Sequence, residues 1–127
     1  MTTVVKTEPQ HRGEFLVSEA NGSLSREVGT LSSGNVAKDG RVVKLVAGEL
    51  VPATGSNASG VSDEAIAGII YGDHDATAAD LKGVVYIARL AEAKASAVVL
   101  HGVTGGGAAA ATKAVTDALA KLNIVLR

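Results

Sequence analysis

Short β-prone runs separated by turn signals make up the middle of the chain. A continuous apolar run at 66–71 is typical of a strand buried on both faces, and Gly68 within it predicts a bulge or a close backbone approach. Pro52 predicts that the strand before it is an edge strand or ends there. The runs that predict strands are 41–46, 49–51, 66–71, 83–89, 96–100 and 124–126. Residues 76–81 are expected to form a helical turn, and 91–95 is compatible with helix or strand.

A helical period follows the glycines at 105–107. The apolar residues at that period are Ala111, Val115, Ala118, Leu119 and Leu122. They predict a helix with one apolar stripe, because side chains three or four residues apart share a helix face. Lys121 suits the C-terminal end of the helix dipole, and Asn123 can adopt the left-handed conformation that ends a helix. The whole pattern predicts a mainly β domain with one C-terminal amphipathic helix, and therefore some α+β character.

Residues 1–13 show no sustained apolar period. They mix threonine, lysine and glutamate around Pro9, which favours an extended backbone. We therefore expect a flexible N-terminal arm over 1–13 and a single domain over 14–127. A domain of this length can bury a sizeable core without a disulfide or a metal ion.

Composition narrows the possible functions. The 127 residues contain no cysteine, which excludes disulfides and thiolate metal sites. The net charge is −1 and the basic residues are scattered, so we expect no nucleic-acid partner. No apolar run approaches the roughly 20 residues of a membrane helix, and the N-terminus lacks a signal core, so no membrane partner is expected. The mean hydropathy of +0.25 favours association between subunits.

Two groups of residues could carry chemistry. Gly105, Gly107 and Ala110 fit the G-x-G-x-x-A pattern of a dinucleotide-binding turn, but no later strand carries an acid for the ribose. Asp73, His74 and Asp75 are sequence neighbours, and neighbours on an extended chain point to opposite faces. We interpret them as a polar turn. We expect no enzyme activity, no cofactor and no metal site; binding of a nucleotide or small molecule at the Gly105–Gly107 turn is the alternative function.

Three blocks resemble, in order and spacing, the head decoration proteins of tailed phages, the family of phage lambda's protein D. They are Glu14–Glu27, Ala67–Thr77 and Leu119–Arg127. The resemblance implies a compact β-clip subunit with minor helices. It also implies a homotrimer at the threefold and quasi-threefold sites of an expanded head, cementing neighbouring copies of the major capsid protein. The expected location is the outer surface of the virion, after synthesis in the cytoplasm of the host bacterium.

In that family the N-terminal arm becomes ordered against the capsid. Short apolar runs can add strands to an exposed sheet edge, and three arms on one trimer bind with avidity. The candidate capsid-binding residues are Thr3, Val4, Val5, Lys6, Glu14, Phe15, Leu16 and Val17. A third possibility, a fibre segment, would also form oligomers but would not bind capsids.

Overall fold

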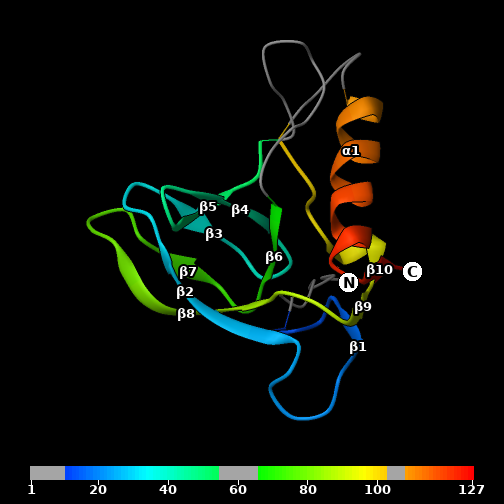
Figure 1. The fold of residues 1–127 in the computed structure, drawn as a ribbon. Helices are drawn as coiled ribbons and strands as arrows, with labels where there is room; N and C mark the ends of the chain where they lie inside the picture. Colours follow the sequence, from blue (N-terminus) through cyan, green and yellow to red (C-terminus); the bar gives the residue numbers. More distant parts are fainter. Residues whose placement is uncertain (1–10, 55–65, 103–107) are drawn as a thin grey trace, which may run out of the picture.

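The computed structural model describes residues 11–54, 66–102 and 108–127, and its centre is a closed barrel (Figure 1). The strands follow one another around the barrel in the order β2-β5-β4-β6-β8. Their bounds are Arg26–Leu31 for β2, Val42–Val46 for β4, Glu49–Pro52 for β5, Ile66–Ile70 for β6 and Leu81–Ile87 for β8. In Figure 1 the barrel lies on the left, beside the single α-helix of the described residues. The predicted mainly β fold with one C-terminal helix is confirmed.

The β4–β5 hairpin turns on two residues with positive φ. Ala47 has φ 52° and Gly48 has φ 82°, which are the values of a type I′ turn. This turn matches the right-handed twist of the flanking strands, so Val46 pairs directly with Glu49. Pro52 is the last residue of β5, as the sequence predicts for the end of a strand.

Strand β6 is almost fully buried because it pairs with β4 on one side and β8 on the other. Gly68 has φ 152°, and a Cβ there would overlap the carbonyl oxygen of Ile87. The register of β4 shifts opposite this glycine, between Val43 and Lys44. The predicted close backbone approach at Gly68 is thus confirmed.

A second sheet lies against the barrel and carries helix α1, Ala108–Lys121 (Figure 1). Its order is β1 (Leu16–Glu19), β9 (Ala91–Ala93) and β10 (Ile124–Leu126), with β1 antiparallel and β10 parallel to β9. The helix buries the predicted stripe at Ala111, Val115 and Leu119. Asn123 has φ 60°, which confirms the left-handed exit and directs the chain into β10.

One hydrophobic cluster joins the helix, the second sheet and the barrel. Its buried residues are Phe15, Val42, Ala53, Ile69, Ile87, Ala91, Ala93, Val115, Leu119 and Ile124. A second cluster fills the other end of the barrel around Leu31, Val43, Leu50, Ile70 and Val84. The first cluster contains Phe15 and packs against Leu16, so it fixes the start of β1 and the chain that leads into it.

Two predicted elements are wrong. Residues 76–81 form no helical turn. Ala76 is hydrogen-bonded through its backbone to Asn35 and Gly34, and the Asp75 carboxylate accepts a hydrogen bond from the Thr77 amide. Residues 96–100 form no strand. Ala95–Ala97 is a 3₁₀ turn, and only Val99 makes a bridge, to Arg41. The ambiguous 91–95 segment is strand over Ala91–Ala93.

Candidate binding surface

Strand β1 forms one edge of the second sheet. Among the described residues its only strand partner is β9, so the other side of Leu16–Glu19 is an open edge. Val17 on this strand has 54% of its surface exposed. We call Leu16–Glu19 the open β1 edge; its unpaired backbone groups can accept an additional strand.

The open β1 edge is held to the rest of the sheet by polar contacts across its face. The Ser18 hydroxyl donates to Glu92 Oε2 on β9 at 2.8 Å, and Arg127 donates to Glu92 Oε1 through Nη2 at 2.6 Å. The hydrogen bonds from Arg127, and next those from Ser18, lower the pKa of the Glu92 carboxyl. Glu92 therefore links β1 to the C-terminal residue through β9.

The structure separates the sequence-predicted contact residues into different environments. Thr3, Val4, Val5 and Lys6 lie outside the described residues. Glu14 is exposed, and its carboxylate accepts the backbone amide of His11 at 3.0 Å. Leu16 is half-buried and Val17 is exposed, but Phe15 is 0% exposed and belongs to the core. At residue 15 only the backbone, not the side chain, is available to a partner.

The chain entering β1 is fixed by Asp39, which has only 6% of its surface exposed. Its Oδ1 accepts the amide of Gly13 at 2.9 Å and the amide of Gly72 at 2.6 Å. Its own amide donates to Asp73 Oδ1 at 2.9 Å. One carboxylate thus joins three segments that are far apart in sequence: the base of the arm, the turn before β4 and the turn after β6.

Tyr71 lies beside this junction. A Cβ on Gly13 would be 2.6 Å from Cε2 of the Tyr71 ring, so the glycine lies directly against the aromatic side chain. The Arg26 guanidinium is 4.4 Å from the ring centroid, and it forms a two-pronged ion pair with Glu19 at 2.8 and 3.0 Å. The hydrogen bonds to Glu19 raise the pKa of Arg26. The Arg26–Glu19 pair connects the end of β1 to the start of β2.

Sequence reasoning missed the roles of Asp39 and Tyr71. The sequence places Asp39 in a Lys-Asp-Gly turn and Tyr71 at the end of a buried strand, and each residue has an ordinary role within its own turn or strand. A tyrosine followed by Gly-Asp, in a chain with few aromatics, was the available signal. The separation of 26 residues between Gly13 and Asp39 left no periodic pattern to detect.

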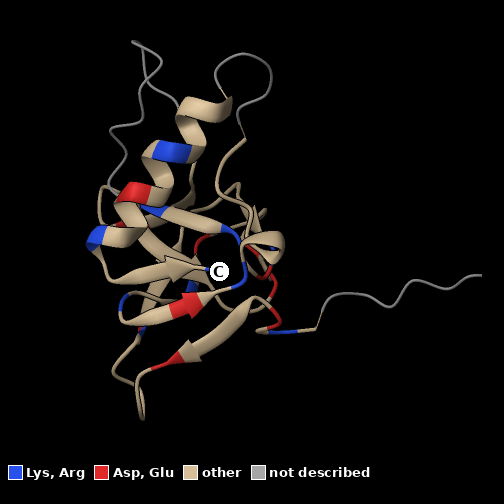
Figure 2. Ribbon diagram, turned by 90° about the vertical axis from the view of Figure 1, so that its right-hand side faces the viewer, with Lys and Arg blue, Asp and Glu red and all other residues tan. Residues whose placement is uncertain are grey.

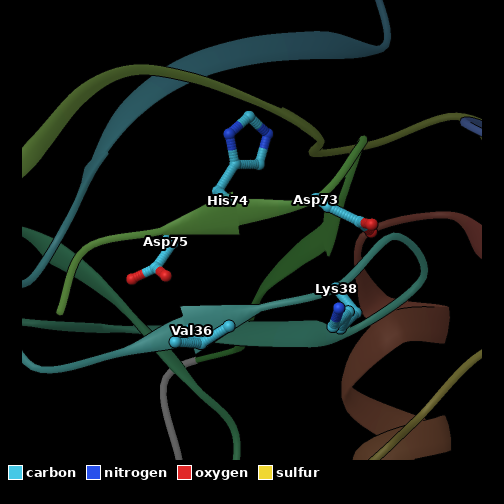
Figure 3. A pocket seen from close by; sticks show the side chains of 5 residues that line it. All are labelled: Val36, Lys38, Asp73, His74 and Asp75. Carbon is cyan, nitrogen blue, oxygen red and sulfur yellow. The ribbon is translucent and has the colours of Figure 1, made fainter.

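Val36, Lys38, Asp73, His74 and Asp75 line an open depression of about 150 Å³ (Figure 3). Figure 3 shows Asp73, His74 and Asp75 pointing in different directions from the short strand β7, His74–Asp75, which pairs with β3, Val36–Ala37. His74 Nε2 donates to the Tyr71 carbonyl at 2.8 Å, and hydrogen bonds from Thr77 lower the pKa of Asp75. Within the described ranges, no three His, Cys, Asp or Glu side chains form a group that could hold a metal ion.

The glycines at 105–107 lie outside the described residues. The strand after helix α1, β10, pairs with β9 rather than with the chain at 98–100. A dinucleotide-binding turn requires a strand that leads directly through the glycines into the helix, beside the strand that follows. The described part of the chain does not have that connection.

Charge of both signs is interleaved over the face with α1 and β10 (Figure 2). Exposed pairs contribute to this pattern, among them Lys113–Asp117 on the helix and Arg127–Glu92 on the sheet. Such a mixed face lacks the clustered basic surface that phosphate backbones require. In the described residues no helix is both long enough and apolar enough to span a membrane.

Comparison with known families gives one result. The family model described as Bacteriophage lambda head decoration protein D matches residues 5–124 of the chain. The match includes the second half of the arm, the open β1 edge, the barrel and the C-terminal helix. No curated protein sequence matches the chain.

Proposed function

The chain belongs to the family of phage lambda head decoration protein D, and we propose that it binds the expanded head as a homotrimer at threefold and quasi-threefold sites and stabilises it. The family is one of structural head proteins, so its members decorate the capsid of the virion. The observation that carries the proposal is the family match over residues 5–124, which extends from the arm through the whole domain. The partner is the phage major capsid protein.

The arm and the open β1 edge are the proposed capsid-binding elements. Residues Thr3–Lys6 and Glu14–Val17 supply short apolar runs, and β1 has backbone groups that can pair with an extended segment of the capsid protein. Val17 would supply an exposed apolar contact, and Phe15 would hold the strand to its own domain. Main-chain pairing of this kind depends little on the side chains of the added segment.

Exposed aliphatic residues support a homo-oligomer. Val28 on β2 is 65% exposed and Leu24, in the preceding turn, is 57% exposed. Leu45 and Val46 at the end of β4 are also exposed. Subunit contacts would remove such side chains from water, and three arms on one trimer raise the effective concentration of the second and third contacts.

Sedimentation with expanded, undecorated heads of the encoding phage tests the proposal. We expect a trimer in solution that co-sediments in about equal copies with the capsid protein. Deleting residues 2–10 removes most of the arm but keeps Gly13 and its contact to Asp39, so the trimer should remain folded and lose head binding. A full-length protein that stays in the supernatant would refute the decoration function. An arm-deleted trimer that still binds would refute the role of the arm.

A further inference from the structure

The base of the arm is held in a defined place on the domain. We propose that Asp39, Tyr71 and Gly72 form a socket for Arg12 and Gly13, and that this socket fixes the point from which the arm leaves to bind its partner. We call these three residues the arm socket. The inference rests on the proposed function, because it assigns positioning residues to the proposed capsid-binding arm.

The first argument is the sharing of one buried oxygen. Asp39 Oδ1 accepts the amides of Gly13 and Gly72, at 2.9 and 2.6 Å, in a site that is nearly closed to solvent. Hydrogen bonds to a charged acceptor are stronger than those between neutral groups. A buried polar group that loses its hydrogen-bond partner lowers the stability of the folded state. Release of Gly13 therefore has an energetic cost that a frayed terminus would not have.

The second argument is steric. Gly13 has φ 76° and lies against the Tyr71 ring, so a Cβ there is disfavoured by the backbone conformation and would crowd the ring. Arg12 extends over the neighbouring turn, since a Cβ on Gly72 would be 2.8 Å from its Nε. Arg12 and Gly13 thus both lie against a surface made by the 71–72 turn.

The third argument concerns the connection to the open β1 edge. The amide of Leu16 donates to the Gly13 carbonyl at 3.0 Å, which closes a tight turn between the arm socket and β1. An arm that starts at the socket is about ten residues long, whereas one released back to β1 is about fifteen, and effective concentration falls about twofold with that lengthening. The second and third contacts of a trimer each carry this factor, so the loss compounds to about three- to fourfold.

The substitution Gly13→Ala tests the socket, with Gly22→Ala as its matched control. Both glycines have positive φ, 76° and 68°, but a Cβ at Gly22 has no atom within 4 Å. Both variants carry the backbone strain, and only Gly13→Ala disrupts the socket. We expect Gly13→Ala to bind heads about three- to fourfold more weakly in a sedimentation titration, and Gly22→Ala to bind like the original chain.

A second pair keeps the test independent of strain. Asp39→Asn weakens the shared acceptor, and Asp80→Asn alters an exposed carboxylate that caps the Ser33 amide at 2.8 Å. Hydrogen exchange should show faster exchange of the Gly13 amide in Asp39→Asn alone. Equal exchange in both variants, or unchanged head affinity in Gly13→Ala, would overturn the arm socket. If the original chain itself ignores heads, the decoration function fails, and the exchange comparison still decides whether the socket exists.

Discussion

Replacing Phe15 by alanine distinguishes a core residue from a contact residue. The sequence places Phe15 beside Leu16 and Val17 in the proposed binding segment, yet its side chain is 0% exposed and lies in the cluster with Val115 and Leu119. We expect Phe15→Ala to destabilise the fold strongly. Val17→Ala, two residues away on the exposed side of β1, should leave stability nearly unchanged.

The magnitude follows from the burial of the ring. Removing a fully buried phenylalanine costs about 3–5 kcal/mol, because apolar contact is lost and a cavity remains. A surface substitution such as Val17→Ala changes stability by about 0.5 kcal/mol or less. For a chain of this length the entropy of unfolding is about 0.25 kcal/mol per kelvin, so Phe15→Ala should lower Tm by about 10–20 °C.

Denaturant and thermal unfolding, followed by circular dichroism, measure both changes. Protein concentrations must be equal, because the apparent stability of an oligomer depends on concentration. A loss below about 1 kcal/mol for Phe15→Ala would refute the assignment of its side chain to the core. Equal losses of stability in Phe15→Ala and Val17→Ala would also refute it, because a buried and an exposed side chain would then contribute equally to the free energy of unfolding.

Three further predictions concern single residues. Gly68→Ala should abolish folding or lower the free energy of unfolding by more than about 4 kcal/mol in the same assay, because the new Cβ would overlap the Ile87 carbonyl oxygen. Mild destabilisation would contradict that close approach. Ala47→Asn should stabilise the β4–β5 hairpin by about 0.5 kcal/mol in urea unfolding, since Asn tolerates positive φ better than Ala; a lower midpoint would contradict the type I′ turn. Because folding lowers the pKa of Glu92, its carboxylate stabilises the fold above the ordinary pKa of 4.5, and this stabilisation is lost as pH falls through the pKa of the folded state. Glu92→Gln should therefore flatten the pH dependence of the free energy of unfolding below pH 4.5. An unchanged slope would argue against the Arg127 contact.

Local patterns predicted the elements whose structure depends on local rules. The apolar stripe of α1 and the buried run of β6 are decided by periodicity, and both were found where the sequence predicts them. The predictions for 76–81 and 96–100 were wrong because a side-chain hydrogen bond to the backbone and a single β-bridge outweighed the local helix and strand propensities. Neither competitor leaves a periodic signal.

The barrel order and the arm socket depend on contacts that are distant in sequence. The pairing of β2 with β5 and β8 brings Leu31 next to both Leu50 and Leu81, and no local motif specifies it. The orientation of Phe15 likewise does not follow from strand alternation, which would place Phe15 and Val17 on the same side. Phe15 lies just before β1, and the pairing of β1 with β9 shifts register between Leu16 and Ser18. The sequence therefore suggested a candidate binding segment but could not tell its inward side chain from its outward ones.

The short segment from Gly13 to Glu19 combines three structural roles, and that arrangement suits a protein that resists load. Gly13 is held by Asp39, Phe15 is embedded in the core, and Leu16–Glu19 forms the open β1 edge. If the arm binds the capsid, tension on it reaches first the hydrogen bond at Gly13 and then the buried ring of Phe15. Extracting that ring requires disruption of the core itself, because burial of the ring contributes to global stability. An arm joined to a surface loop could be pulled out by local unfolding alone, whereas extraction of Phe15 requires disruption of the core.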